Sequence, residues 1–283
     1  MKYPIGCSTI AFARFDLDAA LETIAGLGFS FVDIACIKGG AEHYNPLNRS
    51  RGEYNELNEK VRSHGLRVST LNVNAGSFNN DENRDEHSAT VRAALDCGNV
   101  LGCACVTTKV GDAAGEDDWE ENANRSIGRI RELADYAATL KMKLSLEMPH
   151  TGALAETLDQ SISFFERTDH TATDVTLDTS HVYTAGADIR EVSRHFVGKL
   201  GHVHLRDANP DETHLVPGDG EIDFEFVRSM MVLAGFHRDY VVEIRFDEDK
   251  SLDDIKGELE RGMDDILPAL KMAKKKKKKP VKK

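Results

Sequence analysis

Four side chains that can bind a metal ion stand at the ends of four successive apolar segments of the chain. They are Glu147 in SLEMPH, Asp178 in LDTSH, His204 in HVHLRD and Glu243 in VVEIR. Burying charged groups of this kind together is unfavourable unless an opposite charge compensates them. Three carboxylates and one imidazole form a mixed hard ligand set that suits Mn²⁺, Mg²⁺ or Co²⁺ and is compatible with Zn²⁺. The pattern therefore predicts a site for one divalent metal ion.

Each of these residues also has a structural interpretation. Glu147 could be a solvated carboxylate at the start of a loop, and Asp178 could cap the helix that follows it. Glu243 could pair with a neighbouring arginine. His202 stands two positions before His204, so both imidazoles would face the same side of a strand, and one of the pair could be structural. The joint occurrence of the candidate ligands at successive strand ends favours the metal site.

The elements that must position these residues follow a regular alternation. Short apolar, β-rich segments alternate with amphipathic stretches such as LDAALETIAGLG, in which apolar residues recur three and four apart as on a surface helix. Eight segments are predicted to be strands: YPIGCSTI, FSFVDIAC, LRVSTLNV, CACVTTKV, KLSLEM, DVTLDTS, GHVHLRD and YVVEIR. Mostly continuous apolar runs are typical of parallel strands covered on both faces. The count of eight favours an α/β fold with a single (β/α)₈ TIM barrel over a doubly wound open sheet.

A barrel of this kind gathers the C-terminal ends of its strands around one cup, where function is expected. We predict that residues 1–272 form the barrel as one catalytic domain, since 283 residues lie within the usual range for it. The stretch AKKKKKKPVKK, residues 273–283, is low in complexity and like-charged, so we predict a disordered, solvated tail.

Composition restricts the partners and the compartment. A formal net charge of −12 argues against general binding to nucleic acid, which needs a basic face. The five cysteines include no CxxC pair and are expected to be buried free thiols in a reducing compartment. No signal peptide or run of eighteen apolar residues is evident, so we expect a cytoplasmic protein without membrane contact.

The segments SLEMPH, LDTSHVY, GHVHLRDA with the following PGDGEIDF, and VVEIR resemble the xylose-isomerase-like barrel superfamily. That group includes ketose 3-epimerases, inosose isomerases and dehydratases, hydroxypyruvate isomerases and type IV AP endonucleases. The resemblance extends to about Leu270. It implies that the candidate ligands bind one metal ion and that Glu147 and Glu243 also face each other across the substrate as an acid/base pair. It further implies that His181 contacts substrate oxygens and that Arg206 is a basic substrate contact.

The sequence departs from the ketose 3-epimerases beside the first candidate ligand. Those relatives carry a further glutamate six positions after it, where Ala153 stands here. His150 lies nearby and could contact substrate or have no fixed task. Lys109, at the end of the fourth predicted strand, could bind substrate or close a salt bridge. Asn72 and Asn74 on the third predicted strand are further candidates.

The chemistry expected of such a site is proton transfer at a carbon next to a carbonyl. A cation that chelates two vicinal oxygens of a hydroxy-ketone stabilises the cis-enediolate formed when the C–H is deprotonated. With one carboxylate on each face, Glu147 and Glu243 can take the proton and return it to the same carbon from the other side, which is epimerisation, or to the neighbouring carbon, which is isomerisation. We therefore expect a metal-dependent sugar or polyol isomerase or epimerase with Mn²⁺ as the favoured cofactor. The lack of a GxxxxGK[ST] loop or a cluster of Lys and Arg favours an unphosphorylated keto-sugar or inosose.

Other functions remain open at this point. A lyase of the same superfamily, either a dehydratase or a C-glycoside-cleaving enzyme that could require a small partner subunit, would use the same metal and base. An AP endonuclease is disfavoured because the body of the chain is acidic. A non-catalytic binding protein that kept the barrel is a further alternative. We also expect the chain to form a homo-oligomer, a dimer or a tetramer.

Overall fold

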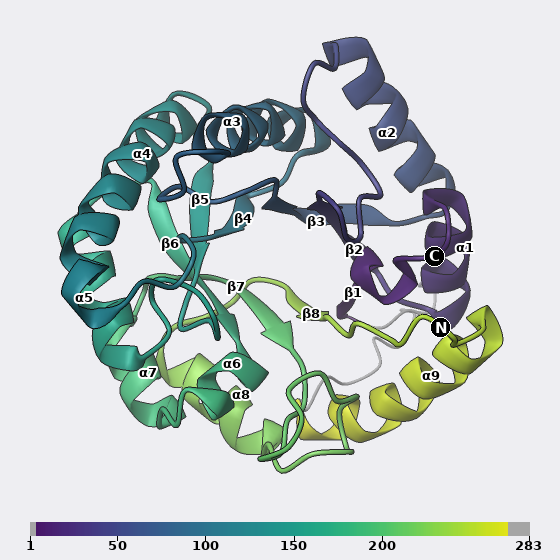
Figure 1. Ribbon diagram of the computed structural model, residues 1–283. Helices are drawn as coiled ribbons and strands as arrows, with labels where there is room; N and C mark the ends of the chain where they lie inside the picture. The colour runs from purple at the N-terminus through teal and green to yellow at the C-terminus, as the bar shows by residue number, and fades with distance from the viewer. Residues whose placement is uncertain (1–3, 271–283) are drawn as a thin grey trace, which may run out of the picture.

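The structure of the chain, a computed structural model, describes residues 4–270. Eight parallel strands form a closed barrel in chain order, and helices form a ring around it (Figure 1). The strands are β1 (Gly6–Ser8), β2 (Phe31–Ile37), β3 (Arg67–Asn74), β4 (Cys105–Lys109), β5 (Lys143–Glu147), β6 (Thr173–Asp178), β7 (Leu200–Leu205) and β8 (Tyr240–Val242). This confirms the predicted (β/α)₈ TIM barrel. The predicted tail, residues 273–283, lies outside the described residues.

All eight predicted strands occur in the structure, although the two that close the barrel are short. β1 and β8 each have three residues, and Gly6 of β1 pairs with Val241 of β8. β6 is buried along its whole length. A parallel strand that is covered on both faces need not alternate between apolar and polar residues, and β6 buries two apolar residues together with four polar ones.

The helices are α1 (Leu17–Leu27), α2 (Arg51–Ser63), α3 (Arg84–Leu101), α4 (Trp119–Thr139), α5 (Leu158–Thr168), α6 (Thr179–Thr184), α7 (Ile189–His195), α8 (Phe224–Leu233) and α9 (Leu252–Ala269), with 3-10 turns η1 (Thr9–Phe12) and η2 (Glu116–Asp118). Local signals fix their ends. Ser50 and Glu53 form a capping box at the start of α2. Gly28 ends α1 with a φ of 92°, a left-handed conformation that glycine adopts without a Cβ clash.

Hydroxyl side chains line part of the barrel interior beneath its mouth. Thr107 of β4 lies 3.1 Å from the hydroxyl of Thr176 in β6, which donates to Ser145 at 2.8 Å. Thr70 of β3 donates to the carbonyl of Cys105 at 3.0 Å. Buried polar groups are stable only when they find such partners. These hydroxyl groups therefore form a hydrogen-bonded layer of side chains inside the barrel, beneath its mouth.

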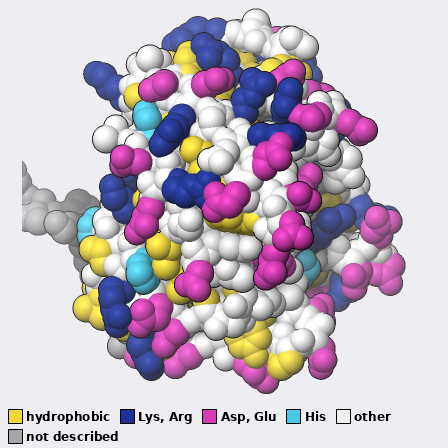
Figure 2. All heavy atoms as spheres, turned by 60° about the vertical axis from the view of Figure 1, so that its left-hand side comes forward, with side chains coloured by type: hydrophobic (Ala, Val, Ile, Leu, Met, Phe, Trp, Pro, Cys, Tyr) yellow, Lys and Arg dark blue, Asp and Glu magenta, His cyan; other side chains and the backbone are white. Residues whose placement is uncertain are grey.

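The outer face over α4 and α5 carries acidic and basic side chains close together (Figure 2). Arg125 pairs with Glu121 within α4, and Arg167 of α5 lies 3.1 Å from Glu120 of α4. Such exposed pairs contribute little to stability because water screens them. In these pairs each arginine neutralises the charge of a nearby glutamate on this face.

Within residues 4–270 no helix is long and apolar enough to cross a lipid bilayer. The five cysteines are buried free thiols, as predicted. Burial raises the pKa of the Cys7 and Cys105 thiols well above the usual range. These thiols are therefore protonated and unreactive at neutral pH.

Candidate metal centre

The mouth of the barrel brings the predicted ligands together. Glu147 and Asp178 are the last residues of β5 and β6, His204 lies in β7, and Glu243 directly follows β8. One oxygen or nitrogen atom from each lies within 4.8 Å of the others. All are buried, with exposed fractions of 0–4%. Parallel pairing explains the convergence, since Asp178 is in register with His204 and the carboxyl ends of all strands meet at one rim.

His204 contacts two of the carboxylates through one ring nitrogen. Its Nδ1 lies 3.0 Å from Oε1 of Glu147 and 3.4 Å from Oε2 of Glu243. Asn72 of β3 donates from Nδ2 to the other oxygen of Glu243 at 2.8 Å. Glu243 therefore turns towards the interior of the barrel, and Asn72, a candidate substrate contact, orients it.

Asp178 serves two tasks with its two oxygens. Its Oδ1 accepts hydrogen bonds from the backbone N–H groups of Ser180 and His181 and caps α6. Its Oδ2 lies 2.7 Å from Nη2 of Arg206 but accepts no hydrogen bond of good geometry. The structural interpretation of Asp178 as a helix cap is thus correct, and its second oxygen, which faces Arg206, is the one that could bind an ion.

Arg206 is a buried guanidinium among these groups. Besides Asp178, its Nη1 lies 3.7 Å from Oε2 of Glu243 and donates to Nδ1 of His214 at 2.9 Å. Burial lowers the pKa of Arg206, but Asp178, Glu243 and Glu147 outweigh this effect and keep it charged. His214, which the sequence did not single out, thereby helps to fix the arginine.

Two further histidines lie beside Glu147. Nε2 of His150 is 4.0 Å from Oε2 of Glu147, and the rings of His150 and His181 lie 3.9 Å apart between centroids. Burial lowers the pKa of both imidazoles, that of His181 to about 3, so both are neutral at physiological pH. Lys109 pairs in register with Glu147, and its Nζ lies 3.5 Å from Asp112. Lys109 thus closes the salt bridge that was one of its two predicted tasks.

The charges at the mouth favour a cation. Burial would raise the pKa of Asp178, but Arg206 lowers it to about 2. For Glu243, burial outweighs its cationic neighbours and raises the pKa to about 7. Burial would lower the pKa of His204, yet Glu243 and the other carboxylates around it raise it well above the usual value. A buried cluster of three carboxylates and one imidazole, in which Oδ2 of Asp178 faces Arg206 but accepts no well-aligned hydrogen bond, fits a divalent ion.

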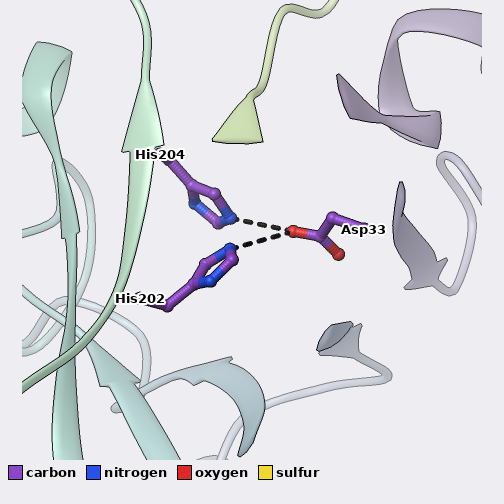
Figure 3. Close-up of side chains that lie close together, drawn as sticks. All are labelled: Asp33, His202 and His204. Atoms are coloured by element: carbon purple, nitrogen blue, oxygen red, sulfur yellow. Dashed lines mark hydrogen bonds and ion pairs between the residues drawn. The ribbon is translucent and has the colours of Figure 1, made fainter. Parts of the chain in front are cut away.

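A carboxylate that the sequence did not single out lies behind His204. Asp33 of β2 is fully buried, and its Oδ2 is 2.9 Å from Nε2 of His204. Figure 3 shows Asp33 facing both His204 and His202. The available signal was an acidic residue within the otherwise apolar segment FVDIAC. That signal does not reveal a partner, because the contact crosses the barrel.

The loop after β7 is organised by a single carboxylate. Oδ2 of Asp207 accepts hydrogen bonds from the N–H groups of Gly218 at 2.9 Å and Gly220 at 3.0 Å, and Oδ1 accepts from Ile222 at 3.0 Å. A Cβ on Gly220 would lie 2.3 Å from Asp207 and 2.4 Å from the carbonyl of Ala208. The segment PGDGEIDF is therefore wrapped closely around Asp207, next to Arg206.

We predict that Asp207→Asn destabilises the protein by roughly 2–4 kcal/mol, because the amide replaces one acceptor oxygen with a donor that faces backbone N–H groups. Urea unfolding followed by circular dichroism measures this change. The matched control is Asp219→Asn in the same loop, since Asp219 forms a partly exposed pair with Arg261. The control should cost less than about 1 kcal/mol. Equal, small costs for both variants would contradict the role of Asp207.

The fold and these side chains define a class of protein: a (β/α)₈ barrel with a buried carboxylate–histidine cluster at its mouth that could hold a divalent ion. The family model of the xylose isomerase-like TIM barrel matches residues 21–267, so the chain belongs to this family. The resemblance noted in the sequence is thereby confirmed.

Curated relatives include sugar epimerases and inosose dehydratases. The chain is 26% identical to an inosose dehydratase of Clostridium tetani over 150 residues, which is 47% of this chain and 49% of that protein. It is 22% identical to a D-psicose 3-epimerase of Enterocloster bolteae over 221 residues, 73% of this chain and 69% of that protein. The match thus spans about half the length of the inosose dehydratase.

Solved structures share the whole fold. A D-psicose 3-epimerase in the presence of D-fructose superposes with a TM-score of 0.77 at 16% identity, covering 95% of this chain and 99% of that one. The IOLI protein with a binding zinc atom gives a TM-score of 0.78 at 20% identity, with coverages of 95% and 99%. At these identities the likeness shows the barrel fold alone.

Proposed function

We propose that the chain is a divalent-metal-dependent isomerase or epimerase of an unphosphorylated keto-sugar or inosose. The observation that carries this proposal is the approach of two carboxylates to one ring nitrogen, since Glu147 and Glu243 lie 3.0 and 3.4 Å from Nδ1 of His204. They come from β5 and from the end of β8, which are not neighbours in the barrel. The carboxylates therefore reach the centre of the mouth from different directions.

Glu147, Asp178, His204 and Glu243 would hold the ion. Once bound, the ion would supply Lewis acidity that polarises vicinal oxygens of the substrate and acidifies the C–H between them. One glutamate would take that proton and the other would deliver a proton, to the same carbon for epimerisation or to the adjacent carbon for isomerisation.

The groups around the candidate ligands suit a substrate rich in hydroxyls. His150 and His181 lie close to Glu147 and are neutral, so they can donate or accept hydrogen bonds. We propose Arg206 and Lys109 as further substrate contacts. Arg206 already lies 2.7 Å from the carboxylate of Asp178, and Lys109 lies 3.5 Å from that of Asp112. A phosphate would have to compete with those carboxylates, which supports an uncharged substrate.

A lyase is the second candidate, and a specific observation favours it. Ala153, which stands where ketose 3-epimerases carry a further glutamate, is buried and bridges to Asp112. With alanine at that position, His150 and His181 are the polar side chains that lie close to Glu147 in place of a further glutamate. If the proton taken from carbon were instead delivered to a hydroxyl on the carbon next to the enediolate, that hydroxyl would leave as water. The enzyme would then be a dehydratase, the activity named for several relatives.

We predict metal-dependent uptake of deuterium from solvent into at least one member of a panel of unphosphorylated ketoses, inososes and oxidised glycosides. A proton that has been abstracted from carbon can exchange with solvent before a proton returns. NMR in deuterated water therefore detects proton abstraction before any product accumulates. The product then separates epimerase, isomerase and lyase. No exchange on any member of the panel by protein that has bound metal would contradict the proposed reaction.

A further inference from the structure

Asp33 is a buried charge that the proposed proton transfer does not use. It lies in the middle of β2, between apolar residues, with no exposed surface. Burying an ionised carboxylate is costly unless a partner compensates it. Its partners come from β7, a strand that is not adjacent to β2 in the barrel. The side chain points into the barrel interior, where the rings of both histidines point towards it (Figure 3).

One oxygen of Asp33 serves both histidines of the HVH segment. Oδ2 lies 2.9 Å from Nε2 of His204 and 3.6 Å from Nε2 of His202. Only the contact with His204 is short enough for a hydrogen bond. Oδ1 has no hydrogen-bond partner among the described residues. The directed contact of Asp33 is thus with His204.

His204 must give up one of its two N–H protons to bind an ion, and this contact determines which nitrogen keeps its proton. A neutral imidazole carries one N–H and one lone pair, and the carboxylate of Asp33 accepts only from an N–H. A proton on Nε2 leaves the lone pair on Nδ1. Nδ1 is the nitrogen that faces Glu147 and Glu243. In the other tautomer a proton would stand where the ion must bind.

We propose that Asp33 is a positioning residue of the metal centre: it holds His204 in the Nε2–H tautomer and directs the Nδ1 lone pair towards the ion. This inference rests on the proposed metal site, and Asp33 itself contacts neither ion nor substrate. Carboxylates placed behind metal-binding histidines fix the ring and make it a stronger ligand. β2 therefore contributes to a centre whose proposed ligands all come from β5 to β8.

His202 provides a matched control. It is buried, stands two positions before His204, and its ring lies edge-on to that of His204 at 4.8 Å between centroids. It faces the same oxygen of Asp33 but lies beyond hydrogen-bonding distance. Replacing it perturbs the same part of the barrel interior without removing the acceptor for His204.

The test combines Zn²⁺ affinity with the tautomer of His204 in the full chain. We expect Asp33→Ala to weaken Zn²⁺ binding by about 10- to 100-fold. Asp33→Asn, which keeps a neutral acceptor, should weaken it less, and His202→Gln should stay within roughly threefold of the unaltered chain. Competition with a chromogenic chelator gives the affinities, and circular dichroism confirms that each variant is folded.

Long-range ¹H–¹⁵N NMR of the unaltered, Zn²⁺-loaded chain should show the His204 proton on Nε2, a result that needs no variant to fold. A proton on Nδ1, or unchanged Zn²⁺ affinity in Asp33→Ala, would overturn the inference while leaving the metal centre in place. Failure of the unaltered chain to bind Zn²⁺, Mn²⁺ or Co²⁺ would instead overturn the proposed function.

Discussion

Glu147→Gln and Glu243→Gln should each lower metal-dependent deuterium exchange by about 10²- to 10⁴-fold, the range typical of losing a general acid or base. Glutamine keeps the shape of the side chain and an acceptor oxygen but cannot take up a proton at neutral pH. Both residues are buried at the mouth, at 4% and 3% exposure, so water cannot readily replace them as the base. NMR initial rates in deuterated water give the effect.

Both glutamates are also candidate ligands, so metal occupancy must be controlled. The rates should be compared at saturating metal, with occupancy measured on the same samples. The matched control is Glu156→Gln, because Glu156 lies in the loop between β5 and α5 and accepts from the N–H of Gly152 at 2.9 Å. The control should exchange within about twofold of the unaltered chain. Near-normal exchange in fully loaded Glu147→Gln and Glu243→Gln would remove both from the proton transfer.

Stripping the metal should abolish exchange and lower the melting temperature by roughly 5–10 °C, since a ligand at 100 times its Kd stabilises a folded protein by about 2.7 kcal/mol. The physical reason is the buried excess of carboxylates, which includes an oxygen of Asp178 without a hydrogen bond. Dialysis against a chelator, followed by titration with Mn²⁺, Co²⁺, Zn²⁺ or Mg²⁺ during thermal unfolding, measures the shift.

His204→Gln is the control for that titration. Its proposed ligand atom, Nδ1, is absent, so added metal should no longer raise the melting temperature appreciably. An equal rise in His204→Gln would show that the stabilising ion binds elsewhere. The group of Glu147, His150 and His181 would then be the first place to look, because their potential ligand atoms also lie within 4.8 Å of one another.

The barrel and the four clustered side chains could be predicted because both depend on regular features of the sequence. Short β-rich runs such as DVTLDTS mark parallel strands, and all strands of a barrel end at the same rim. A polar residue at the end of such a run, such as Asp178, must therefore lie at the mouth. The family segments around the strands strengthened the same prediction.

Contacts across the barrel could not be predicted in this way. Asp33 meets His204 because barrel closure and strand register bring β2 opposite β7, and neither follows from the residues near Asp33. The conformation of the loop after β7 could likewise not be predicted. That loop is wrapped around Asp207 by backbone N–H groups up to fifteen residues further along the chain. Such hydrogen bonds leave no periodic pattern in the sequence.

An anomalous difference map from crystals soaked in Mn²⁺ tests the metal centre most directly. We predict one strong peak at the mouth, within roughly 2.0–2.6 Å of an oxygen from each of Glu147, Asp178 and Glu243 and of Nδ1 of His204. A peak bound instead by His150 and His181, or no peak in crystals that tolerate the soak, would contradict the assignment of these four residues as the ligands.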